Sequence, residues 1–114
     1  MTLLRMFSAV FLIVLAVYTG IVIANHGANL VPVFFGDMAA IAWPGQFNLD
    51  FMGFLMLSGL WISWRHEYSL VGWLLTPLAM TGGMLFLSIY LLVMSFRVNG
   101  DLKVLLIGEG RAAG

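Results

Sequence analysis

The sequence predicts an all-α membrane protein with three transmembrane helices and an interfacial or re-entrant segment between the first and the second. Of its 114 residues, 62% are hydrophobic and 9% are charged, whereas roughly a quarter of the residues in soluble domains are charged. Three apolar runs, at about 6–24, 44–64 and 69–96, are close to or beyond the about 20 residues that a helix needs to cross a membrane. No polar stretch is long enough for a second domain, so we treat residues 1–114 as a single integral membrane domain.

The charged and chemically reactive residues exclude several classes of function. Five basic and five acidic residues give a formal net charge of zero, so the chain has no polybasic patch for nucleic acid. It has no cysteine, which excludes disulfides, thiolate metal sites and cysteine nucleophiles. We find no nucleophile with an adjacent base, no phosphate loop and no metal-ligand set, and therefore predict that the protein is not an enzyme and holds no metal.

The first apolar run, from Met6 to Ala24, is free of charge and follows Arg5. Val22 and Ala24 also fit the small-residue pattern of a signal-peptide cleavage site. The run is longer than the about 7 to 15 apolar residues of a signal peptide, so we expect an uncleaved anchor.

The segment 25–42 separates the first two runs and is too apolar for an ordinary loop. It is too short for a crossing and contains Pro32 and Asp37. We therefore expect an interfacial or re-entrant segment, and a re-entrant form would need protein around it.

The second run, 44–64, begins at Pro44, a residue well suited to the first turn of a helix, and would measure about 31 Å. Gln46, Asn48 and Asp50 occupy its first two turns, at headgroup depth, where the positive end of the helix dipole favours a carboxylate. We predict that Asp50 is a structural tie, hydrogen-bonded to the backbone of the first loop or to another helix end. Proton or cation handling by Asp50 is one alternative, because acids within membranes often serve that purpose, and contact with a partner protein is the other.

The third run, 69–96, is 28 residues long and would measure about 42 Å if straight. It must therefore tilt, project or kink, and Pro77 with Gly82 and Gly83 offers the kink. A short C-terminal tail, 97–114, follows, in which "LKVLLIG" is expected to be a short strand or an interfacial segment.

Three crossings would place the N-terminus and the turn at 65–67 on one side of the membrane. Arg97, Lys103 and Arg111 would then lie on the other side. Arg5 precedes the first span and the first loop has no Lys or Arg, which favours an N-terminus inside.

Two further sets of residues have positions typical of membrane helices. Small residues at spacings of three and four let helices approach closely. The predicted packing residues are Ala16, Gly20 and Ala24 in the first run, Gly59 and Ser63 in the second, and Gly72, Thr76, Ala79 and Gly83 in the third. The predicted interface anchors are Trp43, Trp64, Arg65, Tyr68 and Trp73. Whether the packing residues meet within one chain or face a second protein is left open.

His26 and His66 are the only histidines. Three crossings put them at opposite faces, so they cannot together hold a metal or a haem. Each is a possible cofactor ligand only with help from a partner chain, and the sequence identifies no cofactor.

The order of four short motifs resembles that of small bacterial three-span membrane proteins of the domain-of-unknown-function type. The motifs are "HG" after the first span, "WPGQFNLD" before the second, "GLWISWRH" at its end and "TGGMLFLSIYLL" in the third. The resemblance covers about 26–97 and implies a bacterial cytoplasmic membrane and three helices, with Gln46, Asp50, Trp64 and Gly83 at positions of the family pattern. It implies no activity.

We therefore expect a non-enzymatic accessory or structural subunit that packs against itself or against other subunits of a larger membrane complex, in contact with the lipid bilayer. One alternative is a small oligomeric transporter or proton-coupled carrier that uses Asp50. The other is a subunit that contacts a pigment, haem or quinone through His26 or His66.

Overall fold

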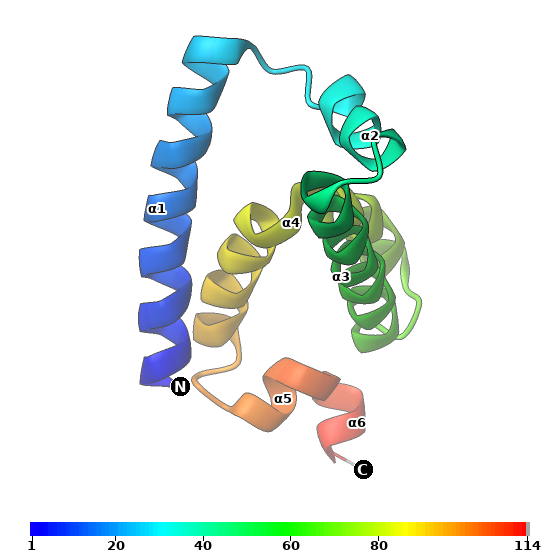
Figure 1. Ribbon diagram of the computed structural model, residues 1–114. Coiled ribbons are helices and arrows are strands. Elements are labelled where there is room, and N and C mark those ends of the chain that lie inside the picture. Colours follow the sequence, from blue (N-terminus) through cyan, green and yellow to red (C-terminus); the bar gives the residue numbers. More distant parts are fainter. Residues whose placement is uncertain (114) are drawn as a thin grey trace.

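The computed structural model describes residues 1–113, which form helices joined by short connections and contain no strand (Figure 1). The helices are α1 (Thr2–His26), α2 (Val31–Ala39), α3 (Trp43–Arg65), α4 (Leu70–Arg97), α5 (Leu102–Ile107) and α6 (Glu109–Ala113). The all-helical prediction is confirmed. By length and composition alone, α1 and α4 are long and apolar enough to cross a membrane, when α4 is counted as one helix from Leu70 to Arg97.

Helix α1 stands apart from most of the molecule and packs mainly on the second half of α4 (Figure 1). Ser8 is its only buried residue. Near its start, Arg5 donates hydrogen bonds to the hydroxyl of Ser95 (3.0 Å) and to the carbonyl of Ser95 (2.8 Å), and its guanidinium lies 4.1 Å from the ring centre of Phe96. These contacts hold the N-terminus beside the end of α4.

Helix α2 lies across the start of α3 and forms the segment that the sequence predicts to be interfacial or re-entrant. Asn48 of α3 donates a hydrogen bond to the carbonyl of Phe34 (3.1 Å), and Gly45 lies against the backbone of Asp37. No residue of α2 is buried. The chain therefore covers α2 only along one edge.

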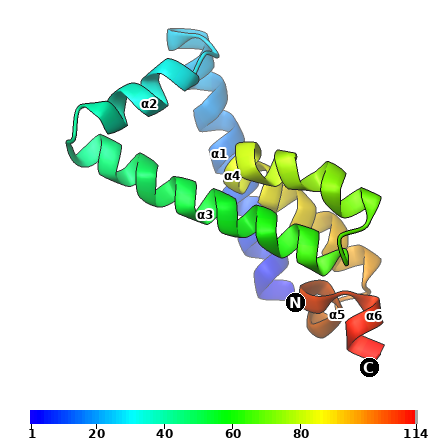
Figure 2. The same cartoon turned by 90° about the vertical axis from the view of Figure 1, so that its right-hand side faces the viewer.

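Helix α4 is folded back on itself at Gly83, the one residue in it with non-helical torsion angles (φ 58°, ψ −144°). Its first half runs antiparallel to α3 and its second half returns alongside α3 (Figure 2). His66 contacts both halves: it lies beside Gly72 and hydrogen-bonds to Tyr90. In a straight helix Gly72 and Tyr90 would be about 27 Å apart, so the fold-back brings them together.

This fold-back corrects the predicted path of the third run. Residues 70–82 and 84–97 measure about 20 and 21 Å, and each half is shorter than the about 30 Å of a hydrocarbon core. Arg97 therefore ends beside Arg65, not on the opposite side of the molecule. The predicted kink is present, and Gly83 supplies it.

The C-terminal tail is helical where the sequence suggested a short strand. Asp101 caps α5, because its carboxylate accepts hydrogen bonds from the backbone N–H groups of Lys103 and Val104. Side chains of α3 then hold α5: Trp61 donates to the carbonyl of Leu106 (3.0 Å). The tail is thus fixed under the end of α3.

Arg65, predicted as an interface anchor, takes part in this docking. It is 6% exposed and donates to the carbonyls of Leu105 (2.6 Å) and Val104 (3.2 Å), near the C-terminal end of α5. Arg111 of α6 completes the attachment by donating to the carbonyl of Trp64 and lying over its ring. The last carbonyls of a helix have no partner within that helix, so a buried guanidinium that donates to them satisfies both groups.

The two ends of the molecule differ in charge. We call the end formed by the N-terminus, the 66–69 turn, the last turn of α4, α5 and α6 the basic end (Figure 1). It contains all five cationic side chains: Arg5, Arg65, Arg97, Lys103 and Arg111. The α2 end, formed by the last turns of α1, by α2 and by the start of α3, has none.

The core lies where α3 meets both halves of α4. Its buried members are Ile62, Ala79 and Tyr90. Ala79 precedes the fold-back and Tyr90 follows it, so one cluster joins the three helical segments. The chain thus has a compact half at the basic end and a loosely packed half at the α2 end.

Candidate functional site

A polar hollow at the basic end brings together five charged or titratable side chains. We call it the polar basin; it has a volume of about 460 Å³ and lies between the ends of α3 and α4 and the start of α6. It is lined by Arg65, His66, Glu67, Met94, Arg97, Val98, Gly108, Glu109 and Gly110. It combines two guanidinium groups, two carboxylates and an imidazole.

Local sequence explains how these side chains converge. Arg65, His66 and Glu67 occupy the last turn of α3 and the turn that follows, and Arg97 ends α4. Gly108 ends α5 with a positive φ of 85°, and a Cβ at this position would lie 2.8 Å from the backbone carbonyl oxygen of Arg65. Glycine therefore allows the tail to close the third side of the basin.

His66 and Tyr90 form a hydrogen-bonded pair at the edge of the basin. The Nε2 atom of His66 lies 2.7 Å from the hydroxyl of Tyr90. Burial lowers the pKa of His66 below 6.5, and the neighbouring Arg65 lowers this pKa further. The neutral imidazole is thus favoured, and it can either donate to or accept from the tyrosine hydroxyl.

Tyr90 connects the polar basin to the core. It is 7% exposed, stacks on Phe86 and meets the edge of Trp61, with ring centres 6.0 and 5.8 Å apart. His66 provides its hydroxyl with a hydrogen-bond partner at the edge of this apolar cluster, so the pair positions both rings.

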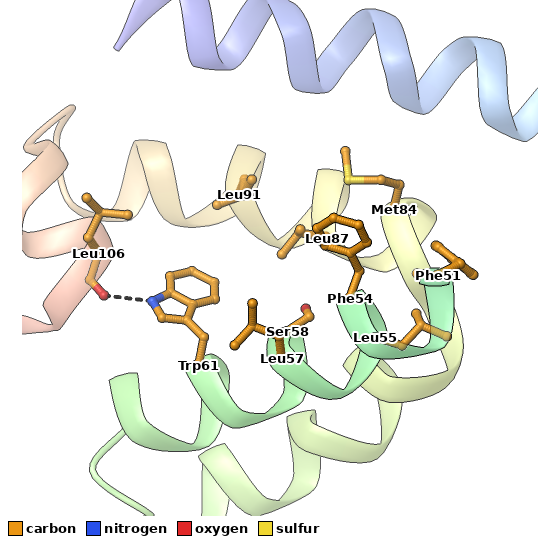
Figure 3. Close-up of a pocket in the computed structure, with 11 residues that line it drawn as sticks. Phe51, Phe54, Leu55, Leu57, Ser58, Trp61, Met84, Leu87, Leu91 and Leu106 are labelled. Carbon is orange, nitrogen blue, oxygen red and sulfur yellow. Dashed lines mark hydrogen bonds between the residues drawn. The ribbon is translucent and has the colours of Figure 1, made fainter. Parts of the chain in front are cut away.

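An apolar groove of about 500 Å³ lies between α3 and the second half of α4, further from the basic end than the polar basin (Figure 3). Its lining residues are Phe51, Phe54, Leu55, Leu57, Ser58, Trp61, Gly83, Met84, Leu87, Leu91 and Leu106. Figure 3 shows the hydrogen bond from Trp61 to Leu106 at one end of the groove. Ser58 brings the only hydroxyl group among these residues, so the groove offers little beyond apolar contact.

The three polar residues at the start of α3 have different surroundings. Asn48 is half-buried and makes the tie to the first-loop backbone, through the carbonyl of Phe34. Its amide also lies 3.4 Å from the carboxylate of Asp37. Gln46 is exposed and lines a shallow hollow beside Trp43. Asp50 is exposed and makes no hydrogen bond or ion pair with any residue from 1 to 113.

The predicted packing residues fall into two groups. Gly59, Ser63, Gly72, Thr76 and Ala79 are buried, and Gly83 is half-buried against Phe51. Ala16, Gly20 and Ala24 of α1 are exposed, and a Cβ at Gly20 would have no atom within 4 Å. The first group lies between α3 and α4, whereas the second group has no partner within the described chain.

The remaining predicted residues lie mostly on the surface. Trp43, Trp64, Tyr68 and Trp73 are exposed, with Tyr68 and Trp73 in contact with one another. His26 is exposed at the end of α1, at the opposite end of the molecule from His66. The structure does not bring the two histidines together. No group of three or more His, Asp or Glu side chains among residues 1–113 is placed to hold a metal ion.

The sequence analysis did not predict Arg97, Glu67 and Glu109 of the basin, or Tyr90 beside it, as site residues. The glycines at 82 and 83 indicate a kink in α4, but no local signal indicates that α4 folds back far enough to bring Tyr90 and Arg97 to the end of α3. One weak feature of the sequence indicates the docking of the tail: Trp61 and Arg65 are four residues apart, so both side chains lie on one face of a helix.

Comparisons of the chain with known protein families, with curated proteins and with solved structures found no match. A function must therefore be argued from the surface, the basin, the groove and the charge distribution of the chain itself.

Proposed function

We propose that this chain is a non-enzymatic integral membrane protein that acts as an accessory or structural subunit, packing against other subunits or against copies of itself in a larger membrane complex. The observation that carries the proposal is the uncovered surface of α1. A helix of 25 residues that buries only Ser8 leaves most of its apolar surface to lipid or to another protein.

The small-residue stripe on α1 favours protein over lipid as the neighbour. Ala16, Gly20 and Ala24 are exposed on one face, with open space beyond Gly20. Membrane helices associate where small residues allow their backbones to approach, because apolar side chains gain little by leaving lipid. A second helix against this stripe would meet a surface of α1 that the described chain leaves uncovered.

We further propose a two-crossing topology. Helix α3 has 23 residues and measures about 34 Å, enough to return the chain across the bilayer after α1. In this arrangement α4 enters from the basic end and turns back at Gly83, with α3 and α1 as the protein cover that a re-entrant segment needs. The positive-inside rule then places the basic end, with both termini, in the cytoplasm. In line with the resemblance above, the membrane would be the bacterial cytoplasmic membrane.

The assembly proposal is tested by extracting a tagged chain from its native membrane with a mild detergent and measuring the native mass. We expect wild type to run as a defined complex larger than the 12.6 kDa chain. Gly20→Leu should lower the population of this complex, because the leucine side chain fills the space that a neighbouring helix needs. Val22→Leu is the matched control, since residues two apart point to nearly opposite faces of a helix.

Two results would contradict the proposal: a wild-type chain that runs alone, or a complex that withstands Gly20→Leu. The mass of the complex also distinguishes a homo-oligomer from an assembly with other proteins.

The topology is tested with single cysteines, because the chain has none of its own. A cysteine at Lys103 should react with a membrane-impermeant maleimide only after the cytoplasmic side is opened. A cysteine at Ala40, at the end of α2, should react in intact cells. Reaction of both positions from the same side would overturn two crossings.

A carrier that uses Asp50 is the second candidate. It is favoured by one observation: Asp50 is exposed two turns inside α3 without a partner among residues 1–113, so it is not a tie to its own chain. Asp50→Asn should abolish proton- or cation-coupled uptake in reconstituted vesicles if this is the function. Under the subunit proposal, this variant should leave the mass of the complex unchanged.

A cofactor-contacting subunit is tested on the same preparation. A bound pigment or haem would give visible absorbance that survives purification and that decreases in His26→Gln or His66→Gln. The apolar groove would then be the first place to look for the macrocycle or ring.

A further inference from the structure

The charged side chains of the polar basin are not paired with one another. It holds Arg65, Arg97, Glu67 and Glu109, yet no ion pair joins any of them among residues 1–113. Arg65 donates to carbonyls of α5, whereas Arg97 and the two carboxylates make no side-chain hydrogen bond within that part of the chain. A ligand in the basin would therefore meet available groups of both signs.

These groups suit a ligand that itself carries both signs. The planar guanidinium of Arg97 presents donors that match a phosphate group, with Arg65 as a second cation beside it. Glu67 and Glu109 are acceptors for an ammonium group, which has three donors. A simple anion would be repelled by the two carboxylates, so the mixture favours a zwitterion.

The location of the basin indicates a lipid. It opens at the ends of α3 and α4. In the two-crossing topology proposed above, on which this inference rests, a helix leaves the hydrocarbon core at this level. Exposed apolar side chains lie on the helices next to the basin, namely Phe96, which precedes Arg97 on α4, and Leu102 and Leu106 on α5. A headgroup in the basin would leave its acyl chains against such apolar surface.

We propose that the polar basin binds the headgroup of a phospholipid that carries both a phosphate and a primary ammonium group, such as phosphatidylethanolamine. The phosphate lies against Arg97, and the ammonium lies between Glu67 and Glu109. This site belongs to the single chain and does not depend on assembly with a partner.

The test is lipid retention by the purified protein, measured by native mass spectrometry after exchange into equal amounts of phosphatidylethanolamine, phosphatidylglycerol and phosphatidylcholine. We expect wild type to retain phosphatidylethanolamine in preference to the other two lipids. Arg97→Gln should reduce this retention at least about tenfold, because the glutamine loses the charge-assisted hydrogen bonds to the phosphate. Glu109→Gln should remove the preference over phosphatidylglycerol.

Matched controls lie outside the basin. Lys103→Gln removes an exposed cation of α5, and Asp50→Asn removes an exposed carboxylate at the α2 end, so both should retain lipid as wild type does. Arg97→Lys keeps the charge and should keep most of the retention, which separates loss of the site from misfolding of Arg97→Gln.

Equal retention of the three lipids by wild type would overturn the proposal, as would an equal loss in Arg97→Gln and Lys103→Gln. Displacement of the lipid by soluble phosphoethanolamine at similar concentration would also overturn it, because the ligand would then be a soluble zwitterion. The lipid profile is read from the isolated chain, so it is independent of the Gly20→Leu assembly test.

Discussion

The basic end of this protein contains many side-chain hydrogen bonds between its helices, whereas the α2 end contains few. At the basic end, side chains from α1, α3, α4 and α6 reach across to other elements, as in the bonds made by Arg5, Trp61, Arg65 and Arg111. At the α2 end the amide of Asn48 makes the only such bonds within residues 1–113. Because the helix ends at the basic end face one another, their orphan carbonyls have side-chain donors within reach.

This difference fits the proposal of an accessory subunit, in which the two ends have different roles. The basic end is a self-contained structural unit that fixes the fold-back of α4 and the tail. The α2 end keeps open apolar surface, including the small-residue stripe of α1. Such a distribution is expected of a subunit that folds at one end and meets partners at the other.

The largest effect on stability is expected from Arg65→Ala. Arg65 is buried and donates to two carbonyls of α5, and a hydrogen bond to a charged group contributes about 1.5–3 kcal/mol. We expect a loss of about 3 kcal/mol in the free energy of unfolding, measured by tryptophan fluorescence in detergent. The amides of α5 should also exchange hydrogen much faster.

Lys103→Ala is the control for this change, because Lys103 is exposed and its side chain makes no bond within residues 1–113. It should change the free energy of unfolding by less than about 0.5 kcal/mol. Equal stability of Arg65→Ala and wild type would show that the tail is not held by this side chain.

Gly83→Ala should have the next largest effect, and it tests the element that joins the two ends. At φ 58° and ψ −144° a residue with a Cβ is strained, and such strain costs about 1–3 kcal/mol. The added Cβ would also lie 2.8 Å from the Cζ atom of Phe51. We expect a loss of about 2–3 kcal/mol in the free energy of unfolding, measured as for Arg65→Ala.

A second substitution separates the two causes of this loss. Gly83→Ala combined with Phe51→Leu removes the steric contact, so recovery should be partial if backbone strain contributes. Gly53→Ala is the control, because it lies within helix α3 with open space around it and should raise stability by up to about 1 kcal/mol. A tolerated Gly83→Ala would mean that α4 can straighten.

The existence of the long helices could be predicted from the sequence, because their ends have local causes. The predicted runs 6–24, 44–64 and 69–96 correspond to α1, α3 and α4, as Pro44 and the charged residues beyond each run suggest. The predicted kink also has a local cause, the adjacent glycines at 82 and 83. The angle of the kink has no local cause, because contacts with His66 and Ile62 of the preceding segment determine where the second half of α4 packs.

Other features depended on contacts that no local pattern reveals. The tail was predicted as a strand or interfacial segment from "LKVLLIG", although Asp101 is a helix N-cap residue that precedes it. Arg65 was predicted to anchor in headgroups, because a terminal arginine usually does so when nothing else is near. Its true partners, Val104 and Leu105, lie about 40 residues further along the chain.

At the α2 end, Asn48→Ala is expected to have a smaller effect. Its partly buried hydrogen bond to the carbonyl of Phe34 is worth about 1 kcal/mol. Because α2 has no buried residue, the loss should appear as faster hydrogen exchange in α2 and not as global unfolding. Gln46→Ala, at an exposed neighbouring position, is the control and should leave hydrogen exchange in α2 unchanged. If exchange in α2 stays slow in Asn48→Ala, another contact must hold α2 against α3.

The smallest effect is the pH dependence that His66 gives to the basic end. Burial and the nearby charge of Arg65 lower the pKa of His66, so the folded protein binds this proton less strongly than the unfolded chain. The contribution of His66 to stability is therefore present above pH 6.5 and is lost as the pH falls through the lowered pKa of the folded state. Charges that face the imidazole from other elements are those of Arg97 on α4 and Glu109 on α6, with Glu67 next to it in the chain.

Thermal unfolding of wild type and His66→Gln between pH 7.5 and 5 measures this contribution as the difference between the two curves. Wild type should lose more stability on acidification, because the glutamine can keep a bond to Tyr90 but takes up no proton. His26→Gln, at the exposed end of α1, should follow wild type. Parallel curves for wild type and His66→Gln would mean that the imidazole is equally free to bind a proton in both states, and the basic end would then be more open to water than its hydrogen bonds indicate.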